Sequence, residues 1–171
     1  MTTSSLDLSI DHSGDGRQVL TFDLAGETYG VDILRVQEIR GWSPVTRIPK
    51  TPKHVLGVLN LRGSIVPIVD LRVRFGIARA EFTPLTVIIV LSIETTEGRR
   101  EFGLVVDAVS DVVDLGADSM RETPSLGGKT SNEVIEGLAT VDDRMLILLN
   151  VDQLVSLDLG PGTAAELKGA A

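Results

Sequence analysis

The sequence of 171 residues contains no cysteine and only two histidines, His12 and His54. Without cysteine the chain cannot form disulfides, thiolate zinc sites or a cysteine nucleophile. Two histidines are too few for a multi-histidine metal site, and neither has a nucleophile motif nearby that would complete a serine triad.

The longest apolar run, Val87–Leu91, is far shorter than the roughly 20 residues of a membrane-spanning helix. The N-terminus lacks the basic and apolar parts of a secretory signal. We therefore expect a soluble, cytoplasmic protein.

Positive charge is also scarce, since the formal net charge is -8. This balance argues against nucleic acid as the main partner. The basic residues are concentrated, however: the segment Arg35–Arg79 holds nine Lys or Arg and only two acids, Glu38 and Asp70. One interpretation is a set of scattered, solvated arginines. The other is a basic face for an acidic protein partner, for which arginine is well suited.

Beta-branched residues set the expected fold class. The chain has 20 Val and 12 Ile, in short apolar runs separated by Gly, Pro, Asp or Asn. Such residues favour pleated, half-buried surfaces. The pattern predicts an all-β barrel or sandwich with a few short helices, one of them at Val151–Leu157. The valines between Leu104 and Val113 follow helical spacing, but valine is a poor helix former. We predict two extended pieces with a bend there.

The chain also repeats itself. Residues 29–39 align with residues 102–112, and the aromatic, glycine, aliphatic and acidic positions agree. Residues 57–58 and 68–71 align with residues 137–138 and 148–151 at one constant offset. The repeat predicts two similar small barrels, about 18–76 and 86–157, within one domain at 17–157. Neither half is long enough to bury a large core alone, so we expect them to pack closely. Residues 1–16 are expected to form a flexible arm and residues 158–171 a tail.

No motif predicts catalysis, and we expect no catalytic, cofactor-binding or metal-binding residues. Asp107, Asp111 and Asp114 could suggest a calcium loop, but the required glycine and distal glutamate are missing. We interpret them as a solvated acidic face. The run Gly127–Thr130 resembles the end of a phosphate-binding loop. Thr123 stands where that motif requires its first glycine, so a surface loop is favoured.

Two longer segments carry a resemblance to a known family. They are Tyr29–Gly41, which includes Val-Gln-Glu-Ile, and Gly57–Arg72, which includes Asn60-Leu61-Arg62-Gly63 in an apolar frame. Together with 102–107 and 143–150, they resemble the CheW family over about residues 18–157. This resemblance implies two SH3-like five-stranded β-barrels with short helices and no enzymatic activity. It also implies a chemotaxis adaptor that couples the cytoplasmic tips of methyl-accepting receptors to the regulatory domain of the histidine kinase CheA, at membrane-associated arrays.

The resemblance also implies roles for individual residues. Val36 and Gly57 match kinase-contact positions. Positions associated with the receptor are matched by Arg62, Gly103, Val109 and Val112. Each has an alternative: the three valines can be core residues, and the two glycines can serve backbone geometry alone.

The pairing of Arg62 offers a further alternative. A guanidinium in an apolar frame needs a partner, and Glu38 is the expected carboxylate. The pair would then hold the surface in shape without touching a receptor.

Three other functions compete with the adaptor. The CheV type carries a receiver after its CheW-like domain, and this chain ends at Ala171. A detached CheA regulatory domain would share the fold. A small ligand-binding barrel, or an enzyme using Asp107 and Asp111, is supported only by the weak phosphate-loop resemblance.

Overall fold

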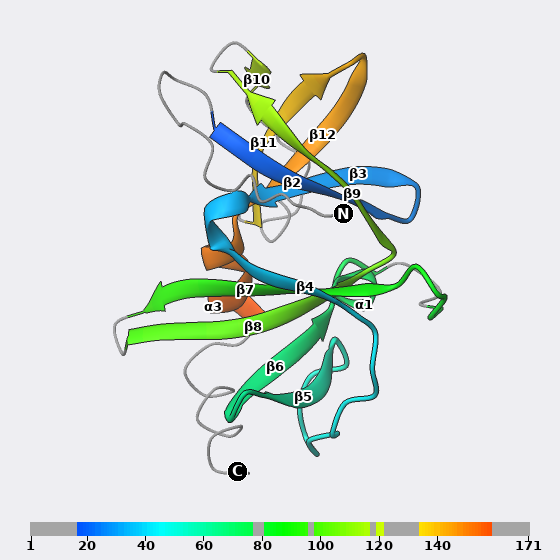
Figure 1. Cartoon of the computed structure of the whole chain (residues 1–171), viewed down its shortest axis with the longest axis vertical. Helices are drawn as coiled ribbons and strands as arrows, with labels where there is room; N and C mark the ends of the chain where they lie inside the picture. Colours follow the sequence, from blue (N-terminus) through cyan, green and yellow to red (C-terminus); the bar gives the residue numbers. More distant parts are fainter. Residues whose placement is uncertain (1–16, 77–80, 96–97, 117–118, 122–133, 159–171) are drawn as a thin grey trace.

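The computed structural model describes residues 17–76, 81–95, 98–116, 119–121 and 134–158. The arm expected at 1–16, the Gly127–Thr130 run and nearly all of the tail expected at 158–171 lie outside these residues. Two β-sheets dominate the described part, one above the other in Figure 1. No helix in the described part is long and apolar enough to cross a membrane.

The first sheet has six strands in the order β10-β11-β12-β3-β2-β9. Their bounds are Met120–Arg121, Ile135–Val141, Arg144–Leu149, Glu27–Asp32, Arg17–Leu24 and Ala108–Leu115, respectively. We call it, with its helix α3, the six-stranded subdomain. Because β10 has only two residues, five strands form its body.

The second sheet has five strands in the order β4-β7-β8-β6-β5. Their bounds are Val36–Gly41, Val87–Thr95, Gly98–Val106, Ser64–Asp70 and Val55–Leu61. We call it, with its helix α1 at Leu71–Arg74, the five-stranded subdomain. The protein is thus an all-β fold of two SH3-like barrels with short helices, as the sequence predicted.

The two barrels do not follow the two halves of the sequence. Strands β2 and β3 belong to the first half, yet they pair with β9 and β12 of the second. Likewise β6 pairs in parallel with β8, and β4 pairs with β7. The expectation of one barrel at 18–76 and another at 86–157 is therefore wrong. The repeat is real, but the strands are exchanged. The six-stranded sheet takes β2 and β3 from the first half of the chain, and the five-stranded sheet takes β7 and β8 from the second half.

Corresponding irregularities support the repeat. Strands β4 and β9 are irregular at aligned places, after Val36 and after Val109. In the hairpins, the register shifts just before Gly57 in β5 and before Gly137 in β11. The same bulge at corresponding positions shows that both halves bend their strands in the same way.

One apolar cluster lies between the subdomains. It includes Phe22 and Val31 of the six-stranded sheet and Leu91 and Leu104 of the five-stranded sheet. All four side chains are fully buried. Burial of this kind contributes about 25 cal/mol per Å² of apolar surface, so the shared cluster holds the two subdomains together.

Local expectations along the chain are mostly confirmed. The helix expected at Val151–Leu157 is α3, Val151–Asp158. The bend expected within 104–113 falls at Asp107, between β8 and β9. In the segment 33–39, aliphatic residues recur every third position, which suits a helical turn as well as a bent strand, and the structure has both: the 3-10 turn η1 at Ile33–Arg35 leads directly into strand β4.

Candidate partner-binding surfaces

Arg62 and Glu38 form the ion pair that the sequence predicted. Arg62 Nη1 lies 2.7 Å from Glu38 Oε1, and Arg40 Nη1 lies 3.4 Å from Glu38 Oε2. Glu38 is on β4 and Arg62 is in the β5–β6 turn, so the pair joins elements from the two ends of the five-stranded sheet. The Arg62 side chain is 66% exposed. The pair therefore holds the barrel edge in shape and still presents a guanidinium to solvent.

The turn that carries Arg62 explains the Asn60–Gly63 run. Arg62 and Gly63 both have positive φ, +54° and +87°, as the tightest hairpin turns require. The Asn60 side-chain oxygen accepts a hydrogen bond from Gly63 N at 3.0 Å. This short polar sequence thus fixes the direction in which Arg62 leaves the hairpin.

Gly57 does not face outward, contrary to the expectation of an exposed contact. It is buried, its φ is +153°, and a Cβ there would overlap the carbonyl oxygen of Thr46. The close backbone approach that glycine allows is made to the chain's own residue, since Thr46 and Val58 exchange backbone hydrogen bonds. Gly57 therefore shapes the loop before β5 and offers no contact surface of its own.

Gly103 is buried as well. A Cβ there would lie 2.7 Å from side-chain atoms of both Ile68 and Ile88. The equivalent position in the repeat is Gly30, where a Cβ would overlap Val19. Each glycine makes room beside a parallel strand pair, β6–β8 or β12–β3. Gly103 can therefore affect the binding of a partner only by changing how the surrounding side chains pack.

The three valines fall into two groups. Val36 on β4 and Val109 on β9 are half-buried: each packs against the central cluster on one side and remains partly exposed on the other. Val112 is 39% exposed, and its aligned residue Ile39 is 44% exposed. Both β4 and β9 are edge strands of their sheets. We name Val36 and Ile39 the β4 surface, and Val109 and Val112 the β9 surface.

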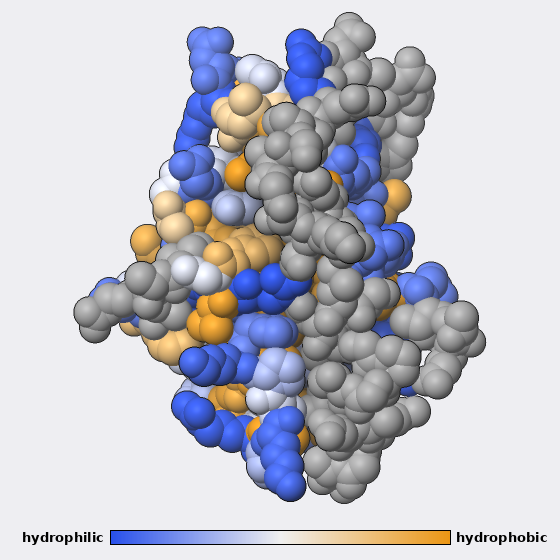
Figure 2. All heavy atoms as spheres, turned by 180° about the vertical axis from the view of Figure 1, so that it is seen from behind, coloured by the Kyte–Doolittle hydropathy of each residue, from blue (hydrophilic) through white to orange (hydrophobic). Residues whose placement is uncertain are grey.

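Apolar residues also reach the surface elsewhere. Viewed from behind, apolar residues gather near mid-height, with hydrophilic residues above and below them (Figure 2). Ile65 and Met145, which occupy aligned places in the two hairpins, are 46% and 54% exposed. Each subdomain therefore exposes one further apolar residue at its hairpin, and single residues of this kind are ordinary on a protein surface.

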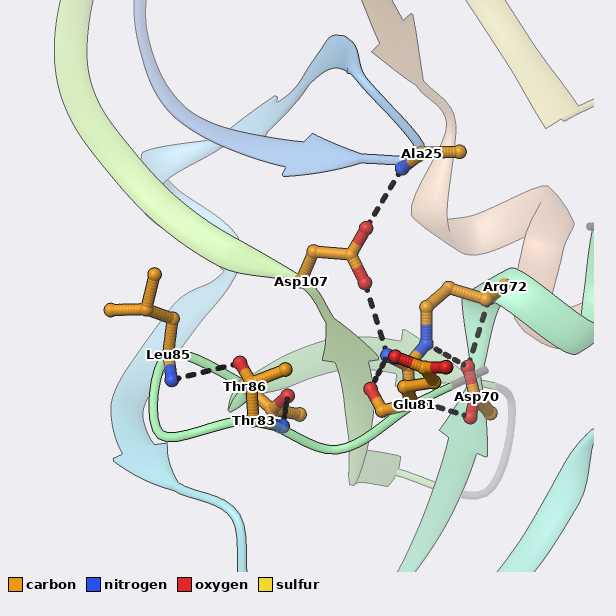
Figure 3. Close-up of polar contacts among 8 residues, drawn as sticks. All are labelled: Ala25, Asp70, Arg72, Glu81, Thr83, Leu85, Thr86 and Asp107. Carbon is orange, nitrogen blue, oxygen red and sulfur yellow. Dashed lines mark hydrogen bonds and ion pairs between the residues drawn. The ribbon is translucent and has the colours of Figure 1, made fainter. Parts of the chain in front are cut away.

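One buried cluster was missed by the sequence analysis. Arg72 of α1 is only 2% exposed, and Asp70 binds it through Nε and Nη2, each at 3.0 Å. Its Nη1 donates to Asp107 at 3.0 Å and to the Glu81 carbonyl oxygen (Figure 3). Asp107 is only partly the solvated residue that was expected: its side chain is 38% exposed and bound to Arg72, whereas Asp111 and Asp114 are exposed.

Electrostatics keep this buried arginine charged. Burial lowers the pKa of the Arg72 guanidinium, but the hydrogen bonds and charges of Asp70 and Asp107 outweigh burial and raise the pKa above its usual value. Asp70 also accepts a hydrogen bond from Arg72 N at the start of α1. One signal of this cluster was present in the sequence. Asp70 directly precedes a short helix, and that position favours a side chain that caps the helix.

No group of three or more metal-ligating side chains is found among the residues that the structure describes. The site is therefore best described as a set of apolar and charged surfaces on two barrels. Two fused SH3-like barrels with apolar edge strands define the class: a small β scaffold that binds other proteins.

Comparisons with known proteins agree with this class. Residues 18–158 match the family profile described as CheW-like domain. The chain is 47% identical to a chemotaxis protein CheW of Klebsiella aerogenes over 141 residues, 82% of either protein. It is 37% identical to a probable chemotaxis protein CheW of Rhizobium etli, covering 85% of this chain and 90% of the relative. The crystal structure of the scaffolding protein TtCheW from Thermoanaerobacter tengcongensis superposes with a TM-score of 0.70 at 36% identity, covering 78% and 88% of the two chains. The chain belongs to the CheW-like family, and it is a chemotaxis scaffold.

Proposed function

We propose that this scaffold couples the cytoplasmic tips of chemotaxis receptors to the regulatory domain of the histidine kinase CheA. It does so without catalysing a reaction, on the cytoplasmic side of membrane-associated receptor arrays. The kinase is bound on the five-stranded subdomain around Val36, and the receptor contacts Arg62 and the β9 surface. Gly57 and Gly103 act on these contacts indirectly, through the backbone and side-chain packing around them.

The observation that carries this proposal is the duplicated edge surface. β4 and β9 are edge strands, and each presents one half-buried valine and one exposed aliphatic side chain at aligned positions. A strand at the edge of a sheet also has unpaired backbone groups that another β protein can approach. Two such surfaces on one molecule are what a coupling protein needs to hold two partners.

The distribution of charge supports an acidic partner on the five-stranded subdomain, which carries both the kinase surface around Val36 and the receptor contact at Arg62. Exposed basic residues gather on the five-stranded subdomain: Arg47, Lys50, Lys53 and Arg62. The basic segment of the sequence is only partly a surface feature, because Arg72 is buried. The remaining exposed cations favour an acidic partner on this side and faster association with it.

A titration of the chain against each partner separately tests the proposal. We expect saturable binding to the CheA regulatory domain and to a receptor-tip fragment from the same organism, and no competition between the two. Binding to the kinase domain should weaken as salt rises, because exposed charges are screened. Absence of binding to both partners would reject the coupling function.

A further inference from the structure

The chain passes between the two subdomains at two places among the described residues. The first crossing follows β3 and runs through Ile33–Arg35 into β4. The second is a single residue long, because β8 ends at Val106 and β9 begins at Ala108. In Figure 1, β8 continues upward into β9 at this point. Short connections of this kind are where a change in the angle between two subdomains is absorbed.

Asp107, the residue at the second crossing, joins the two subdomains through its side chain. One carboxylate oxygen accepts from Arg72 Nη1 at 3.0 Å, and Arg72 belongs to the five-stranded subdomain. The other accepts from Ala25 N at 2.8 Å, and Ala25 is in the β2–β3 turn of the six-stranded subdomain (Figure 3). A single carboxylate is therefore held from both sides.

The contact is not needed to neutralise Arg72. Asp70 already binds the guanidinium through two nitrogens, from within the same subdomain. With Nε and Nη2 fixed by Asp70, the planar guanidinium holds the two N–H groups of Nη1 in fixed directions. One of them donates to Asp107 and the other to the Glu81 carbonyl oxygen. The position of Asp107, between β8 and β9, is thus coupled to the orientation of α1 through Arg72.

The first crossing has a related ion pair with reversed polarity. The repeat aligns Arg72 with Asp152 of α3, and Asp152 binds Arg35 at the first crossing, with Nη2 and Oδ2 2.9 Å apart. Here the side chains are 32% and 49% exposed. The second residue of a helix therefore braces each crossing: Asp152 of α3 braces the first, and Arg72 of α1 braces the second. The Arg35–Asp152 pair is the weaker brace, because water screens both of its side chains, whereas Arg72 is buried and only Asp107, at 38%, is exposed in the other pair.

We propose that Asp107 is a positioning residue, which sets the angle between the β4 surface and the β9 surface so that one molecule can hold both partners in an ordered assembly. This inference rests on the proposed coupling function. Asp107 contributes to neither surface. Its loss should therefore leave each partner's own contact intact and disturb the geometry between the two contacts.

The angle can be measured directly. Because the chain has no cysteine, spin labels can be placed at Ser64→Cys on β6 and Thr140→Cys on β11, both exposed positions in different subdomains. We expect one narrow distance distribution in the parent protein. Asp107→Asn keeps the side-chain size and an acceptor for Ala25 N but loses the charge that binds Arg72. It should broaden or shift the distribution.

Two variants serve as controls for this measurement. Glu136→Gln removes an exposed ion pair with Arg17 inside the six-stranded subdomain, and it should change nothing. Arg35→Gln removes the exposed brace and should have a smaller effect than Asp107→Asn. An unchanged distribution in Asp107→Asn would overturn the inference.

Binding gives the second readout. For Asp107→Asn we expect affinities for the kinase domain and for the receptor fragment within about twofold of the parent protein. The yield of complexes that contain all three proteins should fall fivefold or more. A parallel loss of both affinities with a large drop in melting temperature would show a folding role and overturn the inference. If the parent protein binds neither partner, the coupling function fails, and the distance measurement still decides whether Asp107 positions the subdomains.

Discussion

The guanidinium of Arg62 lies 2.7 Å from the carboxylate of Glu38 and links the β5–β6 turn to β4. These elements come from opposite ends of the five-stranded sheet, so the pair helps to close the barrel. Glu38 neighbours Ile39 of the β4 surface in the chain, but the two side chains point to opposite faces of β4. A change at Arg62 therefore alters a charge at the barrel edge and the hold on the strand that carries the β4 surface.

A double-mutant cycle separates these two effects. Arg62→Ala and Glu38→Ala should each lower the free energy of unfolding by about 0.5 kcal/mol, because the pair is largely exposed. Partner binding should fall in both single variants, and the double variant should be less impaired than the sum of the two. Full additivity in binding would show that Arg62 and Glu38 act independently.

Gly57→Ala should destabilise the fold. The added Cβ meets the Thr46 carbonyl oxygen, and φ is positive, so we expect a loss of about 3 kcal/mol. For a chain of this length that corresponds to a drop in melting temperature of about 6–12 °C. The matched control is Gly41→Ala, where a Cβ meets nothing within 4 Å. Gly57→Asp should lose kinase binding together with stability. A stable Gly57→Asp that no longer binds kinase would instead place Gly57 in the interface.

Gly103→Ala should also be destabilising, but for lack of space. The nearest atoms are Ile68 Cδ1, the movable end of its side chain, and Ile88 Cγ2, a branch at a stiff Cβ, so about 1–3 kcal/mol is expected. Gly30→Ala tests the aligned position and should behave in the same way. Gly116→Ala, with open space around it, is the control for thermal denaturation. Reduced receptor binding by a Gly103→Ala protein of unchanged stability would contradict the packing explanation.

Val112→Asp and Ile39→Asp should separate the two partner surfaces. Both side chains are exposed, so stability should change by about 0.5 kcal/mol or less. A charge in the β9 surface should weaken receptor binding at least tenfold and spare the kinase, and the β4 variant should do the reverse. Each variant is the control for the other in paired titrations. Equal effects of both on both partners would contradict the assignment of one partner to each surface.

The sequence predicted the fold class and the repeat from their patterns, and the Glu38–Arg62 pair from the need of a guanidinium in an apolar frame for a carboxylate. Alternating apolar residues indicate strands, and a run such as Asn60–Gly63 indicates a tight turn. The exchange of strands between halves leaves no such signal. The pattern within β3 specifies which face is buried, but not whether its neighbour is β6 or β12.

The errors at the candidate site have similar causes. A glycine in the sequence indicates an unusual backbone angle or a close approach, but not which part of the molecule makes that approach. At Gly57 the φ is positive and the close neighbour is Thr46 of the same chain. Asp107 was grouped with Asp111 and Asp114 as a solvated face because the three acids lack the rest of a calcium loop, whereas its partner Arg72 is 35 residues away. Contacts of this separation depend on the tertiary fold.

The exchanged strands also constrain the order of events when the protein is made. Strand β3 pairs with β12, so Thr28 lies beside Leu146, a residue synthesised much later. The six-stranded sheet cannot be completed until almost the whole domain has left the ribosome, although its first two strands emerge early. Non-local pairing of this kind slows folding. A nascent chain interrupted after Phe75 would hold β2 and β3 without most of the sheet that buries them, and it would depend on chaperones until the rest of the protein arrived.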